Sequence, residues 1–392
     1  MSRERRRVVI VGGGAMGSSI AYWLTAEPAF DGEVVVIERD PTYSRASSAL
    51  SGSSIRQQFS SDVNIRIGLF GIEFMRNVGQ HLQVDGHAPD IHLREPGYLF
   101  LATAAGKGVL EANHERQIRL GVDVALLGLD DLAGRYPWLA LDDLALASIG
   151  VSGEGWFDGY ALLRAFRARA AAQGARYVNA EAISASMADG RVRSVRLDDG
   201  SELTCDVVVN AGGPWAAKVA AFFDVDLPVR ARRRTVFVLS SDAGLEDAPL
   251  VIDPSGFWMR PDGRGYLSGA PPLGPDEDDL PLEPEHDLFG EFIWPRLAAR
   301  IPAFERLRVQ GSWAGYYEYN TLDQNGIVGP HPEIGGLYFA NGFSGHGIQQ
   351  SPAVGRGIAE LIVDGAYRTL DLSDLAFDRF RTGRLVVERN II

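Results

Sequence analysis

Glycine residues recur in this chain at places where an apolar run gives way to a turn. Gly12, Gly14 and Gly17 form the pattern G-x-G-x-x-G directly after VVIV, and Glu38 ends the next apolar run. The first glycine permits a tight turn, the second lets the backbone approach a pyrophosphate, and the third lets a helix pack closely on a strand. N–H groups at the start of that helix attract phosphate, and the acid can bind ribose hydroxyls. The spacing predicts a dinucleotide site; the alternative is a tight packing turn without a ligand.

Two further glycine-rich segments bear on which dinucleotide this is. Asn210-Ala211-Gly212 ends the apolar run VVVN, and NGFSGHGIQQSP (341–352) leads from the run GLYFA into a helix-like stretch. An NAD site needs only the first glycine turn and its partner half. Three close backbone approaches suit the more extended FAD, and a helix N-terminus can stabilise the negative charge of a reduced flavin ring. We therefore predict FAD, with an NAD-dependent dehydrogenase as the weaker alternative.

The elements that must position these glycines form an α/β pattern. Buried strands are predicted at VVIV, EVVVIERD, SELTCDVVVN and GLYFAN. Helices are predicted over roughly 62–82, 108–120, 159–173 and 352–364. Asp158 is placed to cap the third helix and Gly174 to end it. Ser351 and Pro352 are placed as the N-cap and first residue of the fourth.

The middle of the chain has a different residue pattern from the segments described above. Asp189-Gly190 and Asp199-Gly200 lie between short alternating runs, which predicts two type I′ hairpins in a small meander. Residues 226–322 contain the strand-like VRARRRTVFVLS and GFWMRPDGRGYLSG, and then the acidic stretch GPDEDDLPLEPEHD, which we expect to be a solvated loop. The arginines of VRARRRTV fit a half-exposed strand with paired charges better than an electrostatic site.

Composition limits the classes of partner. The chain has 392 residues, 46% of them hydrophobic and 23% charged, with a net charge of −13. This acidic balance predicts no nucleic-acid partner. The arginine-rich start, MSRERRR, is expected to be a solvated tail, because no apolar segment of a secretory signal follows it. The single Cys205 is expected to be buried, and no cysteine or histidine cluster has metal-ligand spacing, so we predict no metal and a reducing, cytoplasmic location without a transmembrane segment.

Four long stretches resemble the D-amino-acid oxidase superfamily, which includes sarcosine oxidase, dimethylglycine dehydrogenase and glycine oxidase. They are VVIVGGGAMGSSIAYWL, SSALSGSSIRQQFS, VVVNAGGPWAAKVA and NGFSGHGIQQSPAVGRGIAE. Within this family, IRQQFS, EGWFD, WAGYYEYNTLDQNGIVGPHP and the closing NII resemble the FAD-dependent oxidoreductase-domain proteins associated with assembly of respiratory complex I.

The resemblance implies a glutathione-reductase-type FAD-binding Rossmann domain (α/β) and an interleaved α+β substrate domain built on a large mixed sheet. We expect residues 1–90, 145–225 and 323–392 to form the FAD domain, and 91–144 and 226–322 the substrate domain. The residues implied to hold FAD are Gly12, Gly14, Ala15, Met16, Gly17, Glu38, Arg39, Ser47, Ser48, Ala182, Ala211, Gly212, Trp215, Gly342, Phe343, Ser344, Gly345, His346, Gly347, Ile348 and Gln349.

Departures from the family pattern bear on how the flavin is attached, on its reaction with oxygen and on how a substrate carboxylate is bound. Relatives that bind flavin covalently have a histidine about where Ala49 stands, or a cysteine about where Gly315 or Tyr316 stands, so the flavin is expected to be non-covalent. Leu267 is the nearest match to a lysine that promotes reaction with oxygen in sarcosine oxidase, which favours a dehydrogenase. Gln349 stands where a relative has a lysine that binds the substrate carboxylate.

The family oxidises an amine C–N bond by hydride transfer to flavin N5, which needs positioning groups more than acid–base groups. Arg56 and Arg260 are the candidate carboxylate partners, with a structural salt bridge as the alternative for each. Tyr317, between Tyr316 and Tyr319, is placed at the pocket edge or in the core. His346 either contacts flavin or substrate, or holds its own loop.

The predicted function is oxidation of an amino acid or an N-substituted amine with FAD, more as a dehydrogenase than as an oxidase. The electron acceptor is left open between a quinone, an electron-transfer protein and oxygen. The alternative is an FAD-containing assembly or interaction factor with a respiratory-complex partner and little or no turnover.

Overall fold

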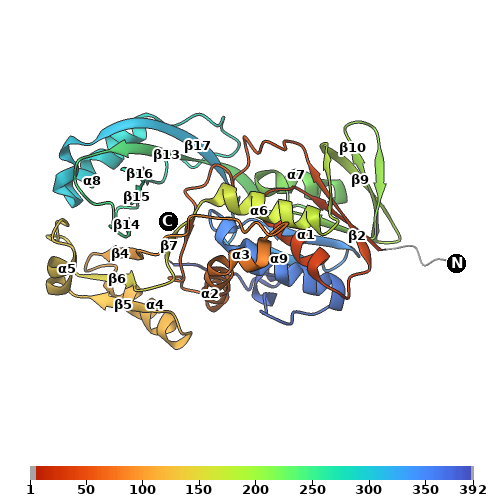
Figure 1. Ribbon diagram of the computed structural model, residues 1–392, viewed down its shortest axis with the longest axis horizontal. Helices are drawn as coiled ribbons and strands as arrows, with labels where there is room; N and C mark the ends of the chain where they lie inside the picture. The colour runs from red at the N-terminus through yellow and green to blue at the C-terminus, as the bar shows by residue number, and fades with distance from the viewer. Residues whose placement is uncertain (1–5, 390–392) are drawn as a thin grey trace.

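The computed structural model describes residues 6–389. The chain contains two large sheets, and each lies in its own half of the molecule (Figure 1). Residues 1–5 of the predicted tail MSRERRR and the closing NII (390–392) lie outside the described residues, whereas Arg6 and Arg7 are not part of a tail, because they begin strand β1 (Arg6–Val11). Within residues 6–389, no helix is long and apolar enough to cross a membrane.

The first sheet has six strands in the order β18-β19-β12-β1-β2-β8. All neighbouring pairs are parallel except β18 with β19. Side chains alternate along β1, with Val8 and Ile10 in one core and Val9 in another, so both faces of the sheet are covered. The strands are β1 (Arg6–Val11), β2 (Gly32–Glu38), β8 (Arg176–Asn179), β12 (Val207–Asn210), β18 (Ile327–Pro330) and β19 (Leu337–Asn341).

Helices cover one face of this sheet, where α1 packs against both α6 and α9. They are α1 (Ala15–Ala26), α2 (Asp62–Arg76), α3 (Val78–Leu82), α6 (Gly159–Ala172) and α9 (Gly347–Asp364). Asp158 caps α6 by accepting a hydrogen bond from Ala161 N, as predicted. The helix predicted over 62–82 is interrupted at Asn77, whose side-chain amide bonds to Glu73 O and competes with the helical pattern.

The prediction for the start of the last helix was wrong. Helix α9 begins at Gly347, with His346 at its N-cap, so Ser351 is not the cap and Pro352 lies inside the helix. Pro352 has no N–H to offer Ile348 O, its partner one turn earlier. The Ser351 hydroxyl donates to that carbonyl at 2.9 Å, so the helix continues through the proline.

A three-stranded meander covers the other face, formed by β9 (Ala182–Ala188), β10 (Arg191–Leu197) and β11 (Glu202–Thr204). Asp189 and Gly190 both have positive φ, as a type I′ turn requires. At the second turn only Gly200 has positive φ, and Leu197 N bonds to Ser201 O, so this turn is a three-residue loop and not type I′. The run SELTCDVVVN is also two strands, β11 and β12, and not one.

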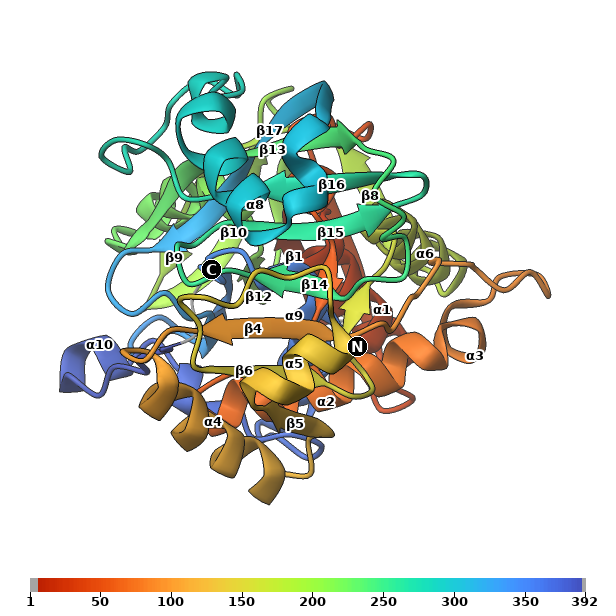
Figure 2. The same ribbon diagram turned by 90° about the vertical axis from the view of Figure 1, so that its left-hand side faces the viewer.

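The second sheet is mixed and has eight strands, in the order β17-β13-β16-β15-β14-β4-β6-β5 (Figure 2). Only β14 and β4 pair in parallel. The strands are β4 (Tyr98–Ala102), β5 (Val124–Leu127), β6 (Leu146–Gly150), β13 (Val229–Ser240), β14 (Leu250–Ile252), β15 (Trp258–Asp262), β16 (Gly265–Gly269) and β17 (Arg308–Asn320). Helices α4 (Lys107–Arg119), α5 (Leu129–Arg135) and α8 (Trp294–Arg300) accompany it. The proposed division into an FAD domain and a substrate domain needs one change. Strand β6 lies in the stretch 145–225 that is expected in the FAD domain, but it belongs to the eight-stranded sheet of the substrate domain.

Arginine side chains on β13 hold the acidic stretch against the sheet. Arg234 donates two hydrogen bonds to the Asp276 carboxylate, each of 2.7 Å, and Arg232 bonds to both Asp276 and Asp278. Arg232 and Arg234 therefore carry paired charges, as predicted, whereas Arg233 bonds to the backbone carbonyl of Pro281. The acidic stretch is more than a solvated loop, because its first carboxylates are anchored by this strand.

Candidate functional site

A cavity of about 630 Å³ is lined by residues from both sheets. Its volume lies in the range of cofactor and small-molecule sites. One end is formed by the glycine turn after β1 and by the edge of the meander. The other is formed by the α9 loop and by the apolar face of the eight-stranded sheet. The cavity therefore joins the expected nucleotide site to a separate small pocket.

The turn after β1 is built around glycines that tolerate no side chain. A Cβ at Gly12 would lie 2.2 Å from Ala211 O, and one at Gly17 would lie 1.9 Å from Gly12 O. Gly14, the N-cap of α1, lines the cavity, and α1 has no side chain capping its N-terminus. Ser48 Oγ accepts from Ala15 N at 3.3 Å. The remaining N–H groups of the first turn are therefore available to an anion.

The Glu38 carboxyl is held at the end of β2, where it faces the same turn. Its Oε2 accepts from Gly13 N at 2.8 Å and its Oε1 from Asp40 N at 2.9 Å. Burial raises the pKa of Glu38, and these backbone hydrogen bonds oppose the rise. A carboxylate has more acceptor sites than these two bonds use, so ribose hydroxyls can still donate to it.

The wall beyond Glu38 carries a buried donor without a partner. The Arg39 guanidinium lies 3.9 Å from the centre of a Trp215 ring and 3.6 Å from Glu181, but its Nη2 makes no hydrogen bond within the described structure. A buried donor of this kind is costly unless a ligand satisfies it. With the glycine turn and Glu38, it makes this end of the cavity fit a dinucleotide.

The predicted FAD residues are distributed as follows. Those that line the cavity are Gly12, Gly14, Ala15, Met16, Glu38, Arg39, Ser47, Ser48, Ala182, Ala211, Gly212, Trp215, Ser344, Gly345, His346, Gly347, Ile348 and Gln349. Gly17, Gly342 and Phe343 lie behind this lining. Gly17 packs α1 on Gly12, Gly342 adopts positive φ, and Phe343 bridges to Tyr319. These three support the lining rather than form it.

Three predicted catalytic residues meet where the α9 loop faces the second sheet. The buried Arg56 guanidinium donates from Nη2 to His346 Nε2 at 3.0 Å, and Gln349 Oε1 accepts from Arg56 N at 2.9 Å. Since a guanidinium can only donate, His346 Nε2 is the acceptor and its proton sits on Nδ1. Burial and the adjacent Arg56 charge lower the pKa of His346 to about 3. A neutral His346 orients Arg56 and is a weak base.

A buried carboxyl that the sequence analysis did not single out supports this cluster. Glu154 is fully buried, and its Oε1 accepts from Gln57 N and Gln58 N at 2.6 and 3.0 Å. Its Oε2 accepts from Gln58 Nε2 at 2.7 Å. Burial raises the pKa of Glu154 to about 7. Glu154 thus fixes the backbone that follows Arg56.

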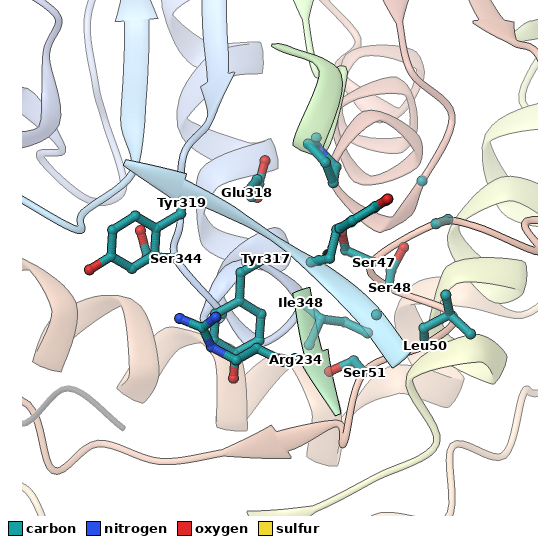
Figure 3. Close-up of a pocket in the computed structure, with 18 of the residues that line it drawn as sticks. Ser47, Ser48, Leu50, Ser51, Arg234, Tyr317, Glu318, Tyr319, Ser344 and Ile348 are labelled. Atoms are coloured by element: carbon teal, nitrogen blue, oxygen red, sulfur yellow. Dashed lines mark hydrogen bonds between the residues drawn. The ribbon is translucent and has the colours of Figure 1, made fainter. Parts of the chain in front are cut away.

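The two other predicted catalytic residues, Tyr317 and Arg260, differ in whether they line the cavity. Tyr317 lines the cavity, with the Arg234 guanidinium carbon 5.1 Å from the centre of its ring (Figure 3). Arg260 does not line it. Its guanidinium donates to Gly52 O, Pro261 O and Asp262, and lies over the ring of Trp156. We therefore assign Arg260 a structural role and leave it out of the proposed substrate contacts.

The second sheet gives this end of the cavity an apolar wall. Tyr98, Leu250, Ile252 and Trp258 line the cavity and belong to one hydrophobic cluster. Beside them, the buried Arg56 brings the positive charge. An amphipathic ligand with one anionic group and one small apolar group matches this combination.

A glycine-turn dinucleotide site that opens onto a charged and apolar pocket is the arrangement expected of an oxidoreductase with a dinucleotide cofactor. Residues 7–361 match the family model described as DAO, FAD dependent oxidoreductase. The chain belongs to this family, and its cofactor is FAD.

Relatives extend over nearly the whole chain. The chain is 45% identical to FAD-dependent oxidoreductase domain-containing protein 1 of Xenopus laevis, over 99% of this chain and 85% of that protein. Among solved structures, L-proline dehydrogenase from P. horikoshii superposes with a TM-score of 0.86 at 27% identity, covering 98% of this chain and 100% of that one. Glycine oxidase from Geobacillus kaustophilus has a TM-score of 0.78 at 25% identity, covering 96% and 99%.

The flavin is held without a covalent bond. Ala49 and Gly315 have no side chain that could bond to it, and Cys205 is buried away from the cavity lining. Burial raises the pKa of the Cys205 thiol to about 12, which keeps it protonated and unreactive. Acid precipitation of the FAD-loaded protein should therefore release all the flavin into the supernatant, as measured by its absorbance. A yellow pellet that resists washing would contradict this expectation.

Sequence reasoning missed Glu154, Glu318, Tyr98 and Trp258. Glu154 had a signal, an acid inside the glycine-rich SGEGW, where a buried carboxyl is unusual. Glu318 stands among tyrosines in YYEY and also lines the cavity. Tyr98 and Trp258 had no local signal, because their strands look like any buried strands.

Proposed function

We propose that the protein oxidises the C–N bond of a small amino acid or N-substituted amino acid and passes the electrons to an acceptor other than oxygen. The observation that carries this proposal is the cluster of Arg56, His346 and Gln349 at one end of the FAD cavity, beside an apolar wall. The two solved relatives, named for L-proline and glycine, support an amino-acid substrate.

Each residue has a defined part in this proposal. Arg56 binds the substrate carboxylate, because a guanidinium offers paired donors to a carboxylate. His346 and Gln349 hold Arg56 in place, and the apolar wall receives the carbon substituents. Bound FAD would supply the hydride acceptor for the oxidation of the substrate carbon. The imine product then hydrolyses in water.

The proposal of a dehydrogenase rests on the positions of the lysines relative to the ring end of the cavity. The only lysines in the sequence are Lys107 and Lys218. Lys107 pairs with Glu111 on α4, and Lys218 pairs with Glu181 at 2.9 Å at the nucleotide end of the cavity. Leu267, the nearest match to the oxygen-promoting lysine, is buried in β16 and does not line the cavity. No lysine therefore lies beside the ring end.

Turnover with two acceptors tests the function. Under argon, the FAD-loaded protein with an N-methyl amino acid or L-proline should reduce an artificial dye and form a carbonyl or cyclic imine product. In air without dye, hydrogen peroxide should form at least about tenfold more slowly. Equal rates with the two acceptors would contradict the dehydrogenase assignment. An assembly factor that only retains FAD would give neither product.

A further inference from the structure

One acidic residue of the cavity has no part in binding nucleotide or substrate. Glu318 lies on β17 next to Tyr317, but the two side chains leave the strand on opposite sides (Figure 3). Tyr317 turns towards Arg234, whereas the Glu318 carboxyl faces the loop that begins α9. Its Oε1 lies 2.9 Å from the position that a Cβ on Gly347 would occupy.

The negative charge of the Glu318 carboxylate has little to balance it in this position. Backbone N–H groups of Gly342 and Phe343 are directed at it, and within residues 6–389 it forms no ion pair. Two other acids that line the cavity are neutralised by cations, Asp276 by two arginines and Glu181 by Lys218, whereas Glu38 is held by backbone N–H groups at the nucleotide end. Burial therefore dominates and raises the pKa of Glu318 to about 8.

The charged and titratable groups on the surrounding elements are Tyr316, Tyr317 and Tyr319 of β17, Arg232, Arg233 and Arg234 of β13, and His346 of the loop. Arg232 and Arg234 are turned towards Asp276, and Arg233 bonds to Pro281 O. His346 is bonded to Arg56. The opposite residue on β13 is Ala231, which carries no charge. The carboxyl thus responds mainly to charge that appears inside the cavity.

We propose that Glu318 is a redox-linked proton carrier, which binds a proton when the flavin in this cavity is reduced and releases it on reoxidation. A hydride brings two electrons and one proton to the flavin and leaves it with one negative charge. A like charge nearby favours the protonated carboxyl. The Glu318 carboxylate therefore takes one proton from solvent, and returns it when the acceptor removes the two electrons.

The pH dependence of the flavin midpoint potential tests this role. For a two-electron couple, each proton taken up contributes about 30 mV per pH unit. Above the pKa of Glu318, about 8, the native holoprotein should take up two protons and show about 59 mV per unit. Glu318→Gln should show about 30 mV per unit in the same range. Glu333→Gln removes an exposed carboxyl outside the cavity and should behave as the native protein.

The measurement uses dithionite and mediator dyes and no amine substrate, so its outcome is independent of the proposed reaction. A slope of about 59 mV per unit in Glu318→Gln would overturn the proposal. If that variant does not retain FAD, proton uptake by the native holoprotein decides the question. When the flavin is reduced at an electrode, which releases no protons of its own, an indicator dye in weak buffer should report uptake of two protons for each flavin at about pH 9, and uptake of one would overturn the proposal.

Discussion

Arg56→Met is expected to lower kcat/KM for a carboxylate-bearing amine by roughly 10²–10³-fold, because removing one side of a buried charge pair costs about 2–5 kcal/mol. The guanidinium is buried at the end of the cavity, where its pairing with a carboxylate is little screened. Steady-state dye reduction under argon measures the effect. Arg56→Lys should recover only part of the loss, since an ammonium cannot make the paired contact.

A substrate control separates carboxylate binding from damage to the site. The amine that lacks the carboxylate should be a poor substrate for the native protein, and Arg56→Met should change its rate by less than about threefold. If both substrates lose activity equally, Arg56 supports the fold or the flavin and does not bind the carboxylate. FAD content and thermal unfolding of the variant should be measured in the same preparation.

Gly17→Ala is expected to abolish stable FAD binding. The added Cβ would lie 1.9 Å from Gly12 O, which is backbone, so α1 or the turn must move. Either movement displaces the N–H groups that face the phosphates. We expect the Kd for FAD to rise at least about 100-fold, equivalent to about 2.7 kcal/mol, as measured by quenching of flavin fluorescence.

Gly134→Ala is the matched control for this change. Gly134 lies in α5, has nothing within 4 Å of the added Cβ and does not have a positive φ. Alanine is favoured over glycine in a helix by about 1 kcal/mol, so this variant should bind FAD normally and unfold no earlier. Normal FAD content in Gly17→Ala would show that the turn is less constrained than its geometry indicates.

The elements that form the FAD site could be predicted because each depends on residues that are close together in the sequence. The glycine turn, the acid at the end of β2 and the strand GLYFAN each depend on a few neighbouring residues, so their types could be predicted from the sequence. The start of α9 could not. Pro352 is favoured at the first position of a helix, but here the Ser351 hydroxyl satisfies the carbonyl that the proline leaves free.

The substrate half depends on contacts between distant residues, which spacing does not show. Arg56 and Arg260 looked equivalent in the sequence, but only Arg56 lines the cavity, because the carbonyl of Gly52 and the carboxylate of Asp262 hold Arg260 elsewhere. The burial of Glu154 and the place of Glu318 in the cavity lining became visible only once the strands and loops around them were in place.

The central claim is that an amine carrying a carboxylate reduces the flavin in this cavity. Anaerobic stopped-flow mixing of the FAD-loaded protein with L-proline, sarcosine and larger N-methyl amino acids tests it most directly. We predict loss of the oxidised flavin absorbance with at least one of them, slowed several-fold when the hydrogen on the reacting carbon is replaced by deuterium. If none of these compounds bleaches a flavin that dithionite reduces readily, the proposed reaction is contradicted.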